Sequence, residues 1–199
     1  MLGSAGTRTT LMEAAFPAIQ RGGVAATAAM AVAGSLLLWV SAKVHVPFWP
    51  VPMTMQTFAV LLIGMLSGWR LGGLTLLVYL IEGAAGLPVF SGTPERGIGF
   101  SYMAGPTGGY LLGFLAAAVL VGGLAERGCG RRAWTALAAF VIGDAVIMIL
   151  GWGWLAVLIG PAKAWTGGVA PFLLGETVKV ALLTTLVPVV WRAVGHGRP

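Results

Sequence analysis

Charged residues and cysteines are scarce in this chain of 199 residues. Only 9% of its residues are charged, 58% are hydrophobic, and cysteine occurs once, at Cys129. Soluble domains carry roughly 25% charged residues. So few charges cannot cover a surface that faces water, whereas a surface that faces lipid needs few. One cysteine also excludes a disulfide framework or a thiolate metal site within the chain. The composition therefore predicts a membrane protein.

The sequence also lacks the motifs of several enzyme classes. It contains no GxxxxGK[ST] phosphate loop, no HExxH zinc motif and no GxSxG nucleophile motif. Its two histidines, His45 and His196, lie far apart and outside the apolar stretches. We therefore expect no enzyme activity, no hydrolysis of ATP by this chain, no metal and no cofactor.

Six stretches are predominantly apolar and are candidate membrane spans, which need about 20 residues. The second and third are short, and only Gly68, Trp69 and Arg70 separate them. These three residues indicate a tight turn at a membrane interface, although one re-entrant element is the alternative. The sequence thus predicts an all-α membrane protein with six transmembrane helices. The predicted spans are residues 23–44, 53–67, 71–86, 107–124, 133–159 and 168–191.

The basic residues predict the orientation. A net charge of +6 does not indicate nucleic-acid binding here, because the basic residues separate apolar stretches and form no patch. Cytoplasmic segments of membrane proteins are enriched in Lys and Arg. We therefore predict cytoplasmic tails at residues 1–22 and 193–199, on either side of a transmembrane domain at residues 23–192. The inner segments then hold Arg8, Arg21, Arg70, Arg127, Arg131, Arg132, Arg192 and Arg198, and the outer segments Lys43, Arg96 and Lys163.

Glu176 and Lys179 are two ionisable residues within the last predicted span. They are three residues apart and so share one helix face. A charge in mid-bilayer costs roughly 3 kcal/mol on insertion scales, which makes such residues rare without a partner or a role. If the helix begins near Gly168, Glu176 lies about 12 Å below its start. Either the pair only neutralises itself, or it offers an acceptor and a donor to a polar ligand group, and we favour the second interpretation.

Three further polar residues are candidates for a ligand site. Asp144 lies mid-span, and Lys179 is its candidate partner across helices; a buried Asp that only holds helices together is an equal alternative. Gln56 opens the second span and either binds a ligand carbonyl or bonds a neighbouring helix. Arg96 either clamps a carboxylate or is already paired with Glu95.

Small residues recur at every fourth position of the first span, at Ala25, Ala29 and Ala33. Such a stripe allows another helix to approach closely. It serves either packing within the chain or docking of a second membrane protein.

Four segments carry a combination of motifs that resembles the BioY family, the substrate-capture (S) subunits of energy-coupling-factor (ECF) biotin transporters. Glu176 is a mild departure, since the family more usually has Asp in the last motif. The segments are PVPMTMQTFAVLL at 50–62, GAAGLPVF at 83–90, GPTGGYL at 105–111 and PFLLGETVK at 171–179.

The resemblance implies an S-component-like bundle that binds biotin near its outer face, in the cytoplasmic membrane of a prokaryote. It implies as partners a transmembrane coupling subunit, for which Ala25, Ala29 and Ala33 are the candidate docking face, and two ATPase subunits. A homo-oligomer, a carrier for another water-soluble vitamin, and an intramembrane enzyme that uses Asp144 and Glu176 remain alternatives.

The resemblance also suggests roles for individual residues against biotin. Glu176 and Lys179, with Asp144 behind them, would bind the ureido ring, and Arg96 would bind the carboxylate. The complete set of candidate ligand-binding residues is Trp49, Gln56, Phe90, Arg96, Tyr110, Asp144, Glu176 and Lys179, in which the aromatic side chains of Trp49, Phe90 and Tyr110 would cover the apolar middle of the ligand.

Overall fold

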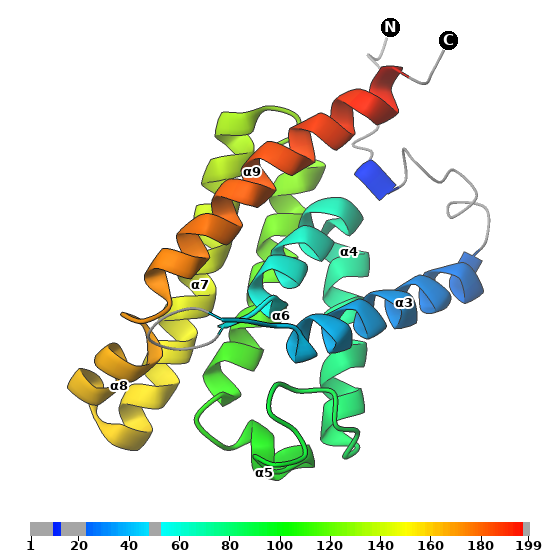
Figure 1. The fold of residues 1–199 in the computed structure, drawn as a ribbon. Coiled ribbons are helices and arrows are strands. Elements are labelled where there is room, and N and C mark those ends of the chain that lie inside the picture. Colours follow the sequence, from blue (N-terminus) through cyan, green and yellow to red (C-terminus); the bar gives the residue numbers. More distant parts are fainter. Residues whose placement is uncertain (1–9, 13–22, 48–52, 197–199) are drawn as a thin grey trace, which may run out of the picture.

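The structure, a computed structural model, describes residues 10–12, 23–47 and 53–196. In these ranges the regular secondary structure is helical except for one short antiparallel hairpin, in which His45 pairs with Thr54 and Val46 with Met53 (Figure 1). The elements are α3 (Gly23–Lys43), β1 (His45–Val46), β2 (Met53–Thr54), α4 (Gln56–Ala84), α5 (Gly99–Met103), α6 (Gly108–Glu126), α7 (Ala133–Ile159), α8 (Pro161–Gly168) and α9 (Leu173–His196).

Five helices in the described ranges, α3, α4, α6, α7 and α9, are long and apolar enough to cross a membrane. Large apolar side chains lie exposed on their outer faces, among them Val157, Ile81 and Leu174. In water this exposure would be unfavourable, at about 25 cal/mol per Å² of apolar surface, but in lipid it carries no such penalty. The structure therefore agrees with an all-α membrane protein.

Helix α4 reverses direction at Gly68, so that its two arms run antiparallel. Gly68 has φ 78° and ψ 176°, a backbone conformation that only glycine adopts readily. Trp69, the first residue after the turn, donates its backbone N–H to Glu126 Oε1 at 3.2 Å, which caps the second arm. The predicted turn between the second and third spans is thus present, although Trp69 and Arg70 already belong to the second arm.

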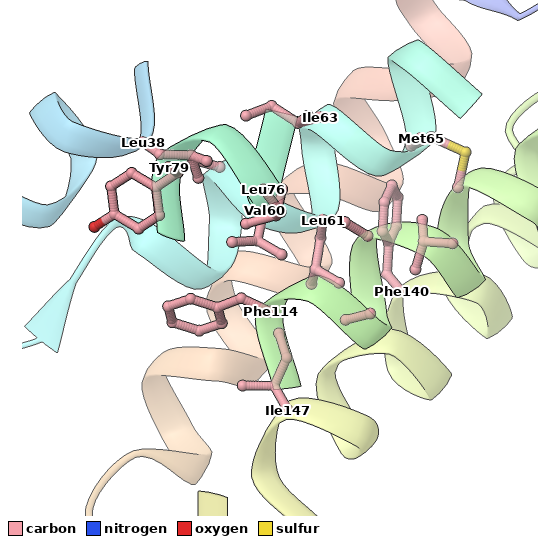
Figure 2. Packing of buried hydrophobic residues seen from close by; sticks show 14 of the residues in the cluster. Leu38, Val60, Leu61, Ile63, Met65, Leu76, Tyr79, Phe114, Phe140 and Ile147 are labelled. Carbon is pink, nitrogen blue, oxygen red and sulfur yellow. The ribbon is translucent and has the colours of Figure 1, made fainter. Parts of the chain in front are cut away.

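The hydrophobic core lies where α6 packs between α4 and α7 (Figure 2). Leu61 and Leu76 come from the two arms of α4, Phe114 from α6, and Phe140 and Ile147 from α7. Gly64 permits a close approach, because a Cβ there would lie 2.8 Å from the carbonyl oxygen of Ala118 on α6. Figure 1 shows α9 along α7, and α3 beside the second arm of α4 at the edge of the bundle.

The last predicted span begins later than expected. Instead of one helix from Gly168, the chain forms α8, which ends at Gly168, then a turn, and α9 from Leu173. Pro171 lies in this turn, where it has no backbone N–H to contribute to a helix. Glu176 consequently lies in the first turn of α9, where the positive end of the helix dipole favours a carboxylate. The predicted depth of about 12 Å below the helix start is therefore wrong.

Candidate functional site

A cavity of about 470 Å³ opens at the end of the bundle that carries the β1–β2 hairpin, α5 and α8. Its wall comes from the hairpin, the start of α4, the loop between α4 and α5, and the start of α6. Tyr102 of α5, Met148 and Leu155 of α7, the end of α8 and the first two turns of α9 complete it. Pockets for small organic ligands fall in the range of about 300–1,000 Å³. The cavity is therefore large enough for one small molecule.

Glu176 and Lys179 lie side by side in the wall of this cavity. Lys179 Nζ is 2.9 Å from Glu176 Oε1, and the two side chains are only 8% and 5% exposed. Their three-residue spacing on α9 places them on one helix face, as the sequence predicts. Taking both charges out of water is costly, and close pairing offsets much of that cost.

Thr57 and Thr54 complete the hydrogen bonds of this pair. Lys179 Nζ donates to Thr57 Oγ1 at 2.9 Å and to the backbone oxygen of Thr54 at 2.7 Å. Thr57 Oγ1 in turn donates to Glu176 Oε2 at 2.7 Å. All three ammonium protons thus have acceptors, and both carboxylate oxygens have donors. Sequence reasoning missed the two threonines as partners, because more than one hundred residues separate them from α9.

Gln56 lies in the cavity wall next to this network, and a second set of hydrogen bonds holds it. Its Nε2 donates to the hydroxyl of Tyr79 at 2.8 Å, and that hydroxyl donates to the backbone oxygen of Val89 at 2.9 Å. Both side chains are buried, so the bonds fix the orientation of the Gln56 amide. The Gln56 amide oxygen has no partner within the described residues in this arrangement and lies in the cavity wall with its acceptor positions open.

Asp144 lies behind the charged pair and does not line the cavity. It is close enough to Glu176 and Lys179 to interact with both electrostatically. Its Oδ1 is buried and makes no hydrogen bond to any described residue. The structure therefore brings together the three ionisable residues that the sequence suggested as a cluster, with Asp144 one layer away from the cavity.

Arg96 and Tyr110 also line the cavity. Arg96 is exposed in the loop before α5, and it forms no ion pair with Glu95, since Lys179–Glu176 is the one ion pair within the described ranges. Tyr110 on α6 donates its hydroxyl to the backbone oxygen of Gly168 at 2.6 Å, which ties α6 to the end of α8. Arg96 is therefore free to meet an anionic ligand group, whereas Tyr110 offers only its ring.

Tyr102 is a wall residue that sequence reasoning did not single out. Its hydroxyl donates to the backbone oxygen of Ser91 at 2.7 Å. Burial raises the pKa of Tyr102 above its ordinary value, so the phenol keeps its proton and remains a donor. His45 lies in the wall as well, through the β1 strand. Neither residue carries a sequence motif that would have identified it.

The structure does not place Phe90 where it was expected. The ring is 1% exposed and lies outside the cavity wall, in the core. It packs edge-on against Tyr79, with ring centroids 5.4 Å apart, and stacks on Tyr102 at 5.0 Å. Gly83 leaves the space that the ring occupies. Phe90 therefore supports the wall from behind and does not cover the ligand. Trp49, the other proposed aromatic cover, lies outside the described residues.

Ala25, Ala29 and Ala33 all lie exposed on α3. The interpretation of the stripe as packing within the chain is therefore wrong. The buried residues of α3 are Ala31, Ser35, Leu38, Ser41 and Ala42, which lie on the face toward α4. Within the described residues, no group of three or more His, Cys, Asp or Glu side chains comes together that would hold a metal ion.

A cavity with a fixed polar wall, set at one end of a helix bundle with apolar outer faces, defines a membrane protein that binds a small polar molecule. The comparison with known families makes this more specific. The family model described as the BioY family matches residues 11–196, which is almost the whole chain. The protein belongs to the BioY family.

Relatives with assigned names support the same assignment. The chain is 41% identical over 143 residues to the probable biotin transporter BioY of Pyrococcus horikoshii, a match that covers 71% of this chain and 82% of that protein. It is 37% identical over 147 residues to the biotin transporter BioY of Thermotoga maritima, which covers 73% and 84% respectively.

A solved structure has the same fold. It is the crystal structure of the S-component for biotin from an ECF-type ABC transporter, with a TM-score of 0.69 over 83% of this chain and 90% of that one. The sequence identity is 20%, so this similarity concerns the fold alone.

Proposed function

We propose that this protein binds biotin in the cavity described above and takes it up across the cytoplasmic membrane of a prokaryote, as the substrate-specific subunit of an ECF-type transporter. The BioY relatives and the S-component fold support this proposal. The chain is a transport protein and not an enzyme. Because it carries no phosphate loop, ATP hydrolysis comes from partner subunits.

The observation that carries the proposal is the hydrogen-bonded network of Glu176, Lys179 and Thr57 in the cavity wall. Biotin has a ureido group with two N–H donors and one carbonyl acceptor. The Glu176 carboxylate and the Gln56 amide oxygen offer acceptors to the two N–H groups, and the Lys179 ammonium would exchange one of its protein acceptors for the ureido carbonyl. Fixed positions reduce the entropy that binding would otherwise lose.

The rest of the cavity matches the remainder of the ligand. Leu111 and Phe114 provide apolar wall for the thioether ring and the valerate chain, together with the ring of Tyr110. Arg96 at the exposed loop is placed to meet the carboxylate. In this pose the ureido ring lies inward and the carboxylate lies toward the mouth of the cavity. Asp144 supports the inner end from one layer away.

We further propose six membrane passes with both termini in the cytoplasm. Five helices qualify by length and composition, and the reversal of α4 at Gly68 makes two passes of one helix. The turn at Gly68 carries Arg70, and the α6–α7 turn carries Arg131 and Arg132. This arrangement puts Arg70, Arg131 and Arg132 inside and the cavity, with Arg96, outside, in agreement with the positive-inside rule.

The partners on this proposal are a transmembrane coupling subunit and two ATPase subunits. The exposed stripe of Ala25, Ala29 and Ala33 on α3 is the docking face for the coupling subunit. Small side chains let two helix backbones approach closely, which is the principal means of helix association in lipid.

Equilibrium binding of labelled biotin to the purified protein in detergent tests the proposal, with unlabelled thiamine and riboflavin as competitors. We expect saturable, stoichiometric binding that only unlabelled biotin displaces. Displacement by thiamine or riboflavin would assign the cavity to another vitamin. Recovery of chemically altered ligand would favour an enzyme that uses Asp144 and Glu176.

A further inference from the structure

Lys43, the last residue of α3, is bonded to the loop that follows α4. Its Nζ donates to the backbone oxygens of Phe90 and Thr93, at 3.1 and 2.8 Å, and to Thr93 Oγ1 at 3.1 Å. Thr93 Oγ1 also donates to the oxygen of Phe90 at 2.7 Å, which closes the group around the ammonium. Thr93 itself is buried. All three protons of the ammonium group are therefore engaged by one short segment of loop.

The same segment forms part of the cavity wall. Ser91 and Gly92 lie between the two residues that Lys43 holds, and Arg96 follows three residues after Thr93; all three line the cavity. The backbone N–H of Arg96 donates to the oxygen of Gly92 at 2.9 Å, so that the position of Arg96 depends on the position of this segment.

The other side of the connection is α3, whose outer face is not covered by any described residue. Ala25, Ala29 and Ala33 are exposed, and α3 packs mainly against the second arm of α4. Its C-terminal end is also bonded to the hairpin side of the cavity, where the backbone N–H of Met55 donates to the oxygen of Ser41 at 3.2 Å. A displacement of α3 would therefore act on the cavity wall at two places.

From these contacts we propose that Lys43 is a positioning residue, which ties residues 90–96 to the end of α3 and thereby sets how fast ligand enters and leaves the cavity. A cation suits this role because backbone carbonyl oxygens surround it, and bonds from a charged donor are about twice as strong as neutral ones. Within the described residues, Lys43 forms no ion pair that would give its charge another purpose. The kinetic half of the proposal rests on the biotin function proposed above, whereas the tether itself does not.

Hydrogen–deuterium exchange of the purified protein tests the tether without any ligand. The variants are Lys43→Met, which removes the donors, Lys43→Arg, which keeps a cationic donor, and Lys163→Met as the matched control, since Lys163 is an exposed cation of α8. We expect faster exchange of the amides of residues 90–97 in Lys43→Met, recovery in Lys43→Arg, and no change in Lys163→Met. Unchanged exchange in Lys43→Met would overturn the tether. Faster exchange spread over all helices, instead of confined to residues 90–97, would overturn it as well.

The dissociation rate of labelled biotin tests the kinetic role. A bond to a charged group contributes about 1.5–3 kcal/mol, so we expect dissociation at least ~10-fold faster in Lys43→Met than in Lys163→Met. Thr93→Val removes the side-chain acceptor from the opposite side. Lys43→Met and Thr93→Val break the same contact. The dissociation rate of Lys43→Met/Thr93→Val should therefore rise by less than the product of the two single increases.

The outcomes separate the tether from the proposed function. If the unmodified protein does not bind biotin while exchange at 90–97 responds to Lys43→Met, the biotin proposal fails and the tether stands. If the unmodified protein binds biotin and Lys43→Met, Thr93→Val and Lys163→Met all release it at the same rate, the role of Lys43 is refuted.

Discussion

Replacing Lys179 with methionine removes the ammonium group from a site in which all of its protons are bonded. The side chain is 8% exposed, and it donates to Glu176 Oε1, Thr57 Oγ1 and the oxygen of Thr54. Methionine fills a similar volume, so the packing changes little. Glu176, which is 5% exposed, then keeps a single donor in Thr57. Breaking one half of a buried ion pair costs about 3–5 kcal/mol, because it leaves a buried charge uncompensated.

Removing both charges should cost less than removing one. In Lys179→Met/Glu176→Leu neither position of the pair carries a charge, and replacement of a buried ion pair by apolar residues of similar size is often neutral or stabilising. We therefore expect the free energy of unfolding to fall by about 3–5 kcal/mol in Lys179→Met and to recover most of that loss in the double variant. Both variants should lose biotin binding, since Lys179→Met lacks the ammonium group of the polar network and the double variant lacks the ammonium and the carboxylate.

Denaturant unfolding in detergent micelles measures the free energy of unfolding, and labelled biotin measures binding in the same preparations. Lys163→Met controls for the loss of a positive charge, because Lys163 is exposed on α8. A Lys179→Met variant as stable as the unmodified protein would refute the energetic reasoning. A double variant no more stable than Lys179→Met would refute it as well.

Three further changes test other parts of the structure. Arg96→Ala should weaken biotin affinity by ~10–100-fold, which is the effect of losing a hydrogen bond to a charged group of about 1.5–3 kcal/mol. The free energy of unfolding should not change, because Arg96 is exposed. Equal affinity of the variant and the unmodified protein in equilibrium binding would exclude a contact between Arg96 and the carboxylate. Ala29→Leu should abolish biotin uptake by cells that also express the coupling and ATPase subunits, because the larger side chain prevents close helix approach. Biotin binding by the purified protein should not change. Intact uptake would show that the alanine stripe does not dock the coupling subunit. Gly68→Val should reduce the yield of folded protein in size-exclusion chromatography, because φ 78° strains any branched residue and a Cβ there would lie 2.6 Å from Glu126 Oε1. Gly123→Val is the control, since a Cβ at Gly123 meets nothing within 4 Å. Equal yields of the two variants would contradict this account of the turn.

Local sequence patterns predicted the parts of this protein that depend on neighbours along the chain. The apolar stretches, the turn at Gly68 and the Glu176–Lys179 pair all follow from spacing within one or two helices. The partners of Lys179 do not, since Thr54 and Thr57 approach only when β2 and the start of α4 pack near α9. Lys43 appeared in the sequence only as an outer cation, and its bond to Thr93 again depends on tertiary contact.

The two incorrect predictions, for Phe90 and for the start of α9, also arise because tertiary contacts decide the outcome. Phe90 was expected in the cavity because an aromatic ring suits an apolar ligand, but Gly83 provides a space that buries it in the core. The start of α9 was placed at Gly168 because the apolar stretch continues through α8 without a break in composition. The turn before Leu173 is set by Pro171 and by contacts with Tyr110, which an apolar count does not register.

The reversal of α4 has a consequence for the surrounding lipid. The first arm, residues 56–67, has twelve residues and extends about 18 Å at 1.5 Å per residue, whereas the hydrocarbon of a bilayer is about 30 Å thick. On the proposed topology this arm cannot cross an unperturbed bilayer. A pass this short is accommodated by local thinning of the membrane or by polar groups drawn below its surface. Gln56 and Thr57 open the arm and line the cavity, so on this topology they are the polar groups that lie below the membrane surface.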